Sequence, residues 1–357
     1  MSLSIGIVGL PNVGKSTLFN ILTKNEILAA NYPFATIEPN SGIVPVPDQR
    51  LNVLQQIYGA SKIIPATVEF IDIAGLVAGA SKGEGLGNQF LANIRNTSAI
   101  IHLVRAFDDD NIIHVNNQIN PAGDIEVINT ELILADLASI DKQLAKLAKE
   151  AKANPKLRTK LDLLNHIKTE LESGKTINQL DIDHDELKDL NLLTAKPVIY
   201  VFNLSEADLT NDAKKAELTA LVAPAKANFI AIKLEDELHT LPDDEAKELL
   251  ESYGVSEGGL AQLIHSAYDI LGLQSYLTAG PKEVHAWTIK QGSTAPQAAG
   301  VIHSDFERGF IAAQIVDYDD LVALGSEQKA KEAGKIRTEG KDYIMCPGDV
   351  VEFRFNV

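Results

Sequence analysis

The sequence begins with a strand, a glycine-rich loop and the start of a helix, and this pattern constrains the fold more than any other. The apolar run 3–8 predicts a short strand, and residues 9–16 follow it directly as Gly-Leu-Pro-Asn-Val-Gly-Lys-Ser. In such a loop, glycines let main-chain N–H groups surround a polyphosphate, a lysine reaches the β and γ phosphates, and a serine hydroxyl is offered to Mg²⁺. The helix predicted over 16–24 adds its dipole. The loop therefore predicts a nucleoside triphosphate as ligand.

Four further apolar, β-branched runs predict a mostly parallel sheet around this loop. They lie at 66–71, 99–104, 197–202 and 228–232. Each run ends at a polar motif, and α/β sheets bind ligands at the carboxyl ends of their parallel strands. We therefore expect a P-loop α/β domain over about 3–250, with these motifs converging on the loop.

The segment 129–195 interrupts this domain and predicts a helical hairpin. Leucines and isoleucines recur there at spacings of three or four on both sides of Asn154-Pro155, as in two antiparallel helices. Seven basic residues stand against one acid, Glu150, between 142 and 160. The seven are Lys142, Lys146, Lys149, Lys152, Lys156, Arg158 and Lys160. Because the whole chain carries a net charge of −17, any contact with RNA should be local to this stretch; a solvated helix face explains the charges equally well.

From 272 to 355 the pattern changes to short apolar segments, which predicts a small strand-rich domain. No apolar run in the chain reaches the roughly 18 residues that span a bilayer, and the first residues do not read as a secretory leader. The single cysteine, Cys346, favours neither an internal disulfide nor a structural zinc site. We expect a cytoplasmic protein with no membrane partner and no DNA partner.

The motif Asp72-Ile-Ala-Gly75-Leu76 follows the second predicted strand. An aspartate at a strand end, followed by glycine, is how P-loop proteins hold Mg²⁺ through water and let the γ phosphate order a loop. Gly75 would supply the sensing N–H group. Leu76 occupies the position at which GTPases of the Ras kind carry the glutamine that orients the attacking water, and a leucine cannot do so.

Two further residues are candidates for the hydrolytic site. His114 lies in a polar stretch after the strand 99–104, and an imidazole can orient or deprotonate water near neutral pH; a loop histidine without chemistry is the alternative. Thr36 lies where a first switch is expected and would provide a second hydroxyl ligand for Mg²⁺.

The motif Asn203-Leu-Ser-Glu206 ends the run 197–202, where guanine-specific relatives carry Asn-Lys-x-Asp. Guanine offers an N1–H and an amine to a carboxylate, whereas adenine offers an N6 amine and an unprotonated N1. Loss of the lysine removes the aliphatic cover over the purine, and Glu206 displaces the carboxylate by one methylene. We therefore expect weakened guanine selectivity, with Asn203 and the Leu204 main chain serving adenine.

Taken together, these motifs closely resemble those of the YchF (Obg-like ATPase) family of P-loop proteins. The resemblance covers essentially the whole length and includes 31–40, 111–115 and 298–307 besides the motifs above. It implies a nucleotide-binding G domain of the Obg type, interrupted by a helical coiled-coil hairpin, and a C-terminal TGS domain, a β-grasp module.

The resemblance also implies a slow ATPase that converts ATP and water to ADP and phosphate and prefers ATP over GTP. By position, it assigns phosphate binding to Asn12, Val13, Gly14, Lys15, Ser16 and Thr17. It assigns base binding to Asn203, Leu204 and Glu206. Mg²⁺ would be bound by Ser16, by Thr36 and, through water, by Asp72. It makes His114 the replacement for the missing glutamine, and it matches Asn12 to an asparagine that holds K⁺ in potassium-activated relatives. It implies association with the ribosome, through its large subunit or as the 70S particle, by the basic hairpin and the TGS domain.

The sequence departs from the family pattern at two places. Ala35 stands where many bacterial relatives have cysteine, so redox control through that thiol is not expected. The fifth nucleotide motif, after Ile232, reads Lys233-Leu-Glu-Asp rather than small residues. Two other functions stay open: a ribosome-associated regulator in which nucleotide only selects the conformation, and a conventional GTPase.

Overall fold

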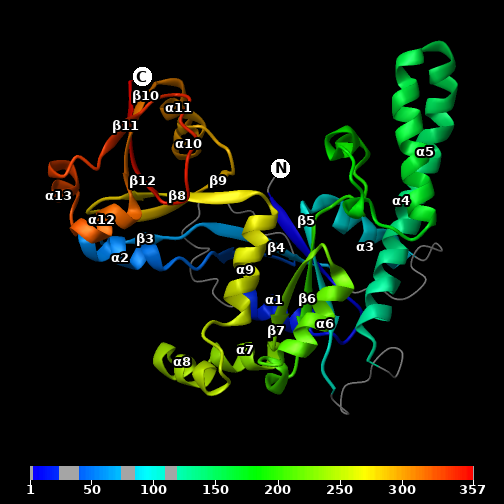
Figure 1. Cartoon of the computed structure of the whole chain (residues 1–357), viewed down its shortest axis with the longest axis horizontal. Helices are drawn as coiled ribbons and strands as arrows, with labels where there is room; N and C mark the ends of the chain where they lie inside the picture. Colours follow the sequence, from blue (N-terminus) through cyan, green and yellow to red (C-terminus); the bar gives the residue numbers. More distant parts are fainter. Residues whose placement is uncertain (1–2, 24–39, 74–84, 109–118, 357) are drawn as a thin grey trace. The chain divides into compact units, whose positions relative to one another are not determined.

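The computed structural model describes residues 3–23, 40–73, 85–108 and 119–356 (Figure 1). The chain divides into two compact units, one formed by 1–43 and 69–263 and the other by 44–68 and 264–357. Each unit contains one six-stranded sheet.

The first sheet carries the P-loop and has the strand order β2-β4-β1-β5-β6-β7. These strands are β1 (Ser4–Val8), β2 (Ser41–Pro45), β4 (Thr67–Asp72), β5 (Ala99–Arg105), β6 (Val198–Asn203) and β7 (Lys226–Ile230). The pairings from β4 to β7 are all parallel. Every residue of β1 and β5 is buried, as expected for central strands of a parallel sheet. The predicted fold class is confirmed.

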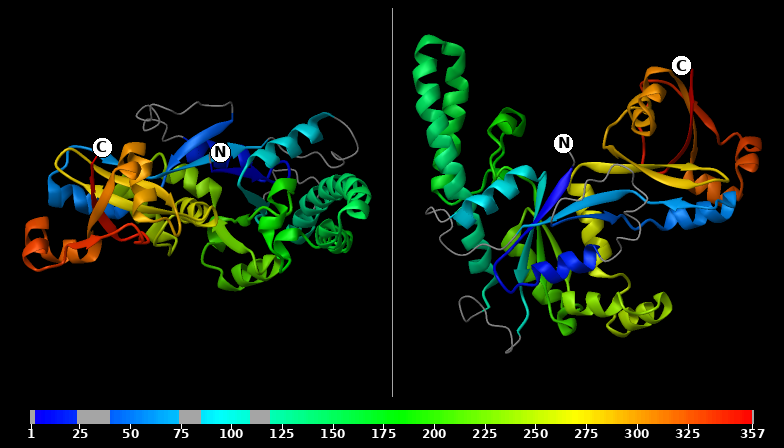
Figure 2. Two further views of the ribbon diagram at one scale, coloured as in Figure 1. Left: turned by 90° about the horizontal axis from the view of Figure 1, so that it is seen from above. Right: turned by 180° about the vertical axis from the view of Figure 1, so that it is seen from behind.

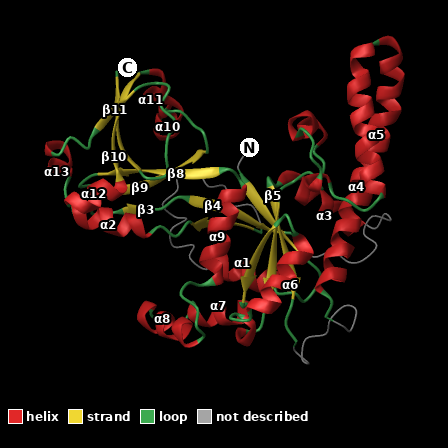
Figure 3. Cartoon of the chain, in the orientation of Figure 1, coloured by secondary structure: helices red, strands yellow, loops and turns green. Residues whose placement is uncertain are grey.

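The helices of the first unit lie between these strands along the chain or follow β7 (Figure 3). They are α1 (Lys15–Thr23), α3 (Gly85–Asn96), α6 (Asp212–Val222), α7 (Ile232–Leu238), α8 (Asp243–Ser252) and α9 (Gly259–Ile270), the last of which crosses the division between the units. The Asn211 side chain begins α6 by accepting a hydrogen bond from the Lys214 N–H.

The predicted hairpin is formed by α4 (Pro121–Ala153) and α5 (Arg158–Glu172), which lie side by side in all views (Figure 2). Ile140, Leu164 and Ile167 are buried between them. The first helix begins at 121 rather than at 129, because Asn120 caps its first turn and Ile125 and Ile128 are buried. The insertion is therefore continuous with the first unit. Three short 3₁₀ helices, η3 (Pro155–Leu157), η4 (Ile177–Gln179) and η5 (His184–Leu190), complete it.

A hydrogen-bonded network fixes the root of the hairpin. The fully buried Asp136 of α4 accepts hydrogen bonds from the N–H groups of Leu193 and Thr194, both at 2.8 Å, and from the Thr194 hydroxyl at 2.7 Å. Arg95, at the end of α3, donates to the Asn191 carbonyl and to the Ser139 hydroxyl. These contacts tie α3 and α4 to the chain that returns to β6.

The sheet of the second unit has the order β11-β10-β12-β8-β9-β3 and mixes parallel with antiparallel pairs. Its strands are β3 (Ile63–Ile64), β8 (Leu273–Ala279), β9 (Val284–Lys290), β10 (Phe310–Asp317), β11 (Arg337–Glu339) and β12 (Asp349–Phe355). Its further helices are α2 (Gln49–Tyr58), α10 (Ala295–Ile302), α11 (Ser304–Arg308), α12 (Tyr318–Leu324) and α13 (Glu327–Glu332). Tyr276, Ala298 and Ile315 form part of its core.

The segment 44–68 belongs to this second unit, although the sequence placed it inside the P-loop domain. Ile63 and Ile64 pair with Val284 and His285 of β9, and the Ser61 hydroxyl donates to the Lys282 carbonyl at 2.7 Å. A strand of two residues, paired more than two hundred positions away, leaves no periodic signal in the sequence. Within the described part of the chain, no helix combines the length and apolarity needed to cross a membrane.

Candidate functional site

The glycine-rich loop connects β1 to α1. A Cβ atom on Gly9 would lie 2.5 Å from the Leu103 carbonyl oxygen, so the loop can leave the sheet here only with glycine. Asn12 and Gly14 have φ values of +64° and +103°, in the left-handed region. Backbone turns of this kind point successive N–H groups into one concavity, which is a binding site for anions.

Lys15 is the first residue of α1, and its side chain is buried against the loop. Its ammonium donates to the Gly9 carbonyl at 2.9 Å and to the Leu10 carbonyl at 2.7 Å. Burial lowers the pKa of Lys15 to about 8, and the carboxylate of Asp72 opposes that shift. The ammonium is therefore desolvated, and its two hydrogen bonds are to neutral carbonyls, so an incoming polyphosphate would stabilise its charge.

Ser16 and Thr17, in the first turn of α1, are exposed, whereas Val13 is buried. Asp72 ends β4, and its Oδ1 atom is buried with no hydrogen-bond partner among the described residues. Burial raises the pKa of Asp72, while Lys15 lowers it. A buried, unsatisfied carboxylate oxygen and an accessible serine hydroxyl fit Mg²⁺, which prefers oxygen ligands and keeps several of its waters.

His102 of β5 is fully buried beneath this site and pairs in register with Val8. Burial lowers its pKa to about 3, and the positive charge of Lys15 contributes to the shift. The imidazole is therefore neutral at physiological pH and leaves Lys15 as the local cation. The sequence had given no reason to select this residue.

Asn203, at the carboxyl end of β6, joins the P-loop to the loop after β7. Its Nδ2 donates to the Val13 carbonyl and its Oδ1 accepts from the Ile232 N–H, both at 3.1 Å. The Leu204 N–H donates to the Ile230 carbonyl at 2.8 Å, inside the sheet. A base contact from the Leu204 main chain therefore depends on its carbonyl oxygen, which is an acceptor.

The fifth motif forms the first turn of α7. Lys233 is exposed, and its Nζ lies 3.7 Å from Oε1 of Glu206, one of the residues expected from the sequence to bind the base. Glu235 is buried and accepts a hydrogen bond from the Gly259 N–H at 2.6 Å, which caps the start of α9. The sequence does not predict the ion pair between Lys233 and Glu206, although its fifth motif departs from the family pattern.

The structure thus brings together the described residues that the sequence selected, at the ends of β1, β4 and β6. The proposed catalytic residue and two switch residues, His114, Thr36 and Gly75, lie outside the described residues, as do Ala35 and Leu76.

The chain is similar to known proteins in sequence and in structure. Residues 4–128 match a family model described as 50S ribosome-binding GTPase, and residues 273–356 match the C-terminal YchF-GTPase model, described as a protein of unknown function. Proteins named ribosome-binding ATPase YchF are similar over the full length of both chains, with 52% identity in Pasteurella multocida and 50% in Escherichia coli O157:H7 and Bacillus subtilis.

The solved structure of the Schizosaccharomyces pombe YchF GTPase is also similar. It is 38% identical, with a TM-score of 0.86, and the alignment covers 99% of this chain and 98% of that one. Identity at this level over nearly the whole of both chains, with the same fold, decides the classification. The chain belongs to the YchF family.

Proposed function

We propose that the protein is a slow, Mg²⁺-dependent ATPase that acts as a nucleotide-controlled switch in the cytoplasm and associates with the ribosome. The names of the bacterial relatives support both the activity and the partner. The observation that carries the proposal is the motif 203–206, in which Asn203 is kept but Leu204 and Glu206 replace the lysine and aspartate that favour guanine.

At the phosphate end, the proposal rests on Lys15 and Asp72. The loop amides and the Lys15 ammonium bind the phosphates. Ser16, Thr36 and, through water, the Asp72 carboxylate, whose Oδ1 is buried, would hold Mg²⁺. When bound, the ion neutralises charge on the phosphate oxygens. The resemblance of Asn12 to a potassium-holding asparagine makes K⁺ a second proposed cation.

At the base end, two contacts favour adenine. The Lys233 ammonium lies 3.7 Å from the Glu206 carboxylate. This cation competes with the N1–H group of guanine for the carboxylate. The Leu204 N–H is already bonded to Ile230, so Leu204 offers a carbonyl acceptor, the partner that the N6 amine of adenine requires. ATP should therefore bind more tightly than GTP.

Hydrolysis is assigned to a water positioned by His114, because Leu76 has no polar group with which to orient it. Release of phosphate would free the segments that contain Thr36 and Gly75, which is how the switch would operate.

Parallel titrations with ATP and GTP test the nucleotide preference. The wild type should bind ATP more tightly, and Lys233→Ala should recover part of the GTP affinity because Glu206 is released. Lys247→Ala, an exposed lysine beside Glu251, is the matched control. The solved relative from Schizosaccharomyces pombe is called a GTPase, and tighter binding of GTP here would establish a conventional GTPase and contradict the proposal.

The ribosome contact is proposed for the basic hairpin, with the TGS domain as a second surface. Lys142, Lys146 and Lys149 are exposed on α4, at spacings of four and three residues that place them along one stripe. Among the described residues none of the three forms an ion pair, whereas Lys168 and Lys175 of the same insertion pair with Asp141 and Glu170. Unpaired cations on a chain of charge −17 favour a local polyanionic partner such as RNA.

Reversal of these three lysines to glutamate should weaken co-sedimentation with ribosomes and reduce its dependence on salt. Reversal of Lys215, Lys226 and Lys247, which changes the net charge equally, should have little effect. If both triple variants co-sediment with ribosomes equally, the basic residues of the hairpin are only a solvated helix face. If ribosome binding is the same whether or not ATP is hydrolysed, the result favours the alternative function, a ribosome-associated regulator in which nucleotide only selects the conformation.

A further inference from the structure

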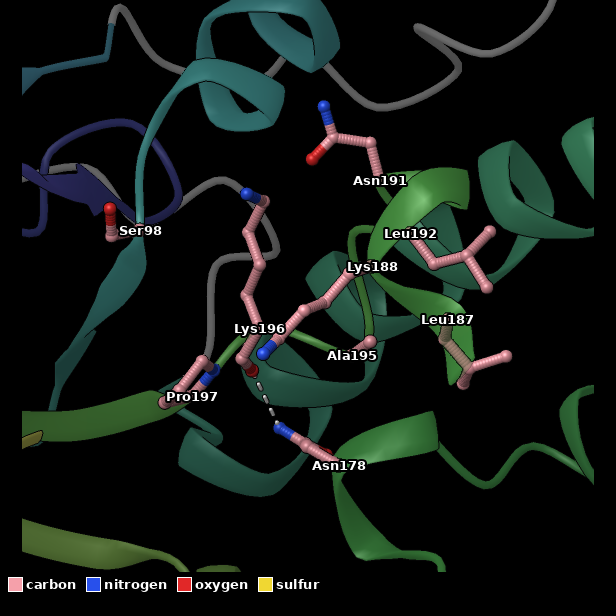
Figure 4. A pocket seen from close by; sticks show the side chains of 9 residues that line it. All are labelled: Ser98, Asn178, Leu187, Lys188, Asn191, Leu192, Ala195, Lys196 and Pro197. Atoms are coloured by element: carbon pink, nitrogen blue, oxygen red, sulfur yellow. Dashed lines mark hydrogen bonds between the residues drawn. The ribbon is translucent and has the colours of Figure 1, made fainter. Parts of the chain in front are cut away.

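A cavity lies at the root of the helical hairpin. It has a volume of about 490 Å³, which is within the usual range for small-molecule sites (Figure 4). It is lined by Ser98, Asn178, Leu187, Lys188, Asn191, Leu192, Ala195, Lys196 and Pro197.

The cavity is separate from the nucleotide site. Ser98 and Pro197 immediately precede β5 and β6, so the cavity lies at the amino ends of these strands. Asn203 lies at the carboxyl end of β6. A strand of this length spans about 20 Å, so a ligand in the cavity would not touch the P-loop.

One side of the cavity is apolar. Leu187, Leu192, Ala195 and Pro197 contribute to it, and the two leucines are 2% and 3% exposed, so their positions are fixed by packing. A preformed apolar wall of this kind accepts an aliphatic or aromatic body.

The polar groups of the cavity are cationic or neutral, and among the described residues no carboxylate lines it. The Lys196 ammonium donates to the carbonyls of Arg95, at 3.1 Å, and Thr97. In Figure 4 this ammonium lies between the side chains of Ser98 and Asn191. Neither of those two side chains makes a hydrogen bond within the described part of the chain, so a hydroxyl and an amide remain available as donors beside the ammonium.

The electrostatics of Lys196 favour an anion. Burial and the nearby positive charge of Arg95 lower the pKa of Lys196, with only Asp136 opposing them. An anionic ligand group beside Lys196 would offset the free-energy cost of keeping this buried ammonium charged. Glu186 and Asp189 are exposed on the neighbouring η5 segment but do not line the cavity, and their charge disfavours multiply charged ligands.

We propose that this cavity binds a small monoanionic organic ligand, a carboxylate with an apolar or aromatic body, whose charged group lies against Lys196, Ser98 and Asn191. The proposal for this cavity is the same whether the P-loop binds ATP or GTP.

Binding of anilinonaphthalene sulfonate, a monoanion with an aromatic body, tests the proposal on the full chain by fluorescence titration. Its uncharged analogue, phenylnaphthylamine, tests the requirement for charge. The dye should bind at one saturable site that ATP with Mg²⁺ does not displace, and more tightly than the neutral analogue. The isosteric variant Asn191→Asp, which adds a negative charge beside Lys196, should raise the dissociation constant about tenfold, and Ala195→Trp should fill the cavity and abolish binding.

Asn52→Asp, on the exposed face of α2, makes the same change in net charge away from the cavity and should bind the dye normally. The melting temperatures of all variants confirm folding, and if Ala195→Trp does not fold, Asn191→Asp alone decides the outcome. The proposal is overturned by absence of saturable binding, by displacement with ATP, by equal affinity of the neutral analogue, or by unchanged affinity of Asn191→Asp.

Discussion

The side chain of Asn203 donates a hydrogen bond to the main-chain carbonyl of Val13 at 3.1 Å, across 190 positions of sequence. Its other amide atom accepts from the Ile232 N–H at the same distance. One buried side chain thus holds the phosphate loop and the loop after β7 in a fixed relation.

Asn203→Ala should weaken ATP binding by about tenfold or more, because two buried main-chain groups lose partners worth about 1–3 kcal/mol each. Isothermal titration gives the affinity, and thermal melting should show a lower melting temperature. Asn165→Ala, on the exposed face of α5, is the control. If Asn203→Ala bound ATP normally, the bridging role would be wrong.

The affinity for ATP should fall as pH rises through about 8, the pKa to which burial lowers Lys15 in the free protein. Deprotonation removes the ammonium that the phosphates need. The stability of the nucleotide-free protein should change in the opposite direction. Between pH values of about 8 and 10.5, Lys15 is protonated in the unfolded chain but mostly neutral in the folded protein. The contribution of Lys15 to the free energy of unfolding therefore increases with pH in that window.

Lys15→Met should remove both effects, which titrations and denaturant unfolding between pH 7 and 10.5 can measure. An ATP affinity with the same pH dependence in wild type and Lys15→Met would assign the effect to another group.

Asp72→Asn should abolish most of the gain in ATP affinity that Mg²⁺ provides. The amide keeps the shape of the side chain but lacks the charge that attracts the cation, and the cost of burying a carboxylate disappears, so the fold should be retained. ATP titrations with Mg²⁺ and with chelator measure the difference. Asp141→Asn, which alters an exposed aspartate that pairs with Lys168, should behave as wild type. An undiminished Mg²⁺ effect in Asp72→Asn would exclude Asp72 from the ion site.

His114→Ala should lower kcat about a hundredfold while ATP affinity stays nearly constant, because a residue that positions water acts on the chemical step. Single-turnover hydrolysis separates the two quantities. His166→Ala, an exposed histidine of α5, is the control. If turnover is unchanged in His114→Ala, a group other than His114 positions the attacking water.

Asp136→Ala should reduce the free energy of unfolding by about 3 kcal/mol, because it leaves the buried N–H groups of Leu193 and Thr194 without an acceptor. Urea denaturation measures this loss, and hydrogen exchange should accelerate at the hairpin root. Asp141→Ala on the exposed face of the same helix should cost less than about 0.5 kcal/mol. Similar losses in both variants would show that the network at the root contributes little.

The local elements were largely predictable. The runs at 66–71, 99–104 and 197–202 became β4, β5 and β6 with ends within one residue, because continuous β-branched runs bounded by polar motifs are typical of buried parallel strands. The leucine periodicity likewise predicted both helices of the hairpin. The start of α4 was missed by eight residues because its first turns pack against the sheet, which the sequence does not reveal.

The sequence by itself determined the ligand class, the order of the strands along the chain and the hairpin, because glycine-rich loops and apolar periodicity act over a few residues. The tertiary structure decided that 44–68 belongs with the C-terminal unit, that Asn203 bridges two loops, that Lys233 pairs with Glu206, and that Lys15 and Lys196 are desolvated. Those properties depend on burial and on contacts between distant segments, and neither exists until the chain has folded.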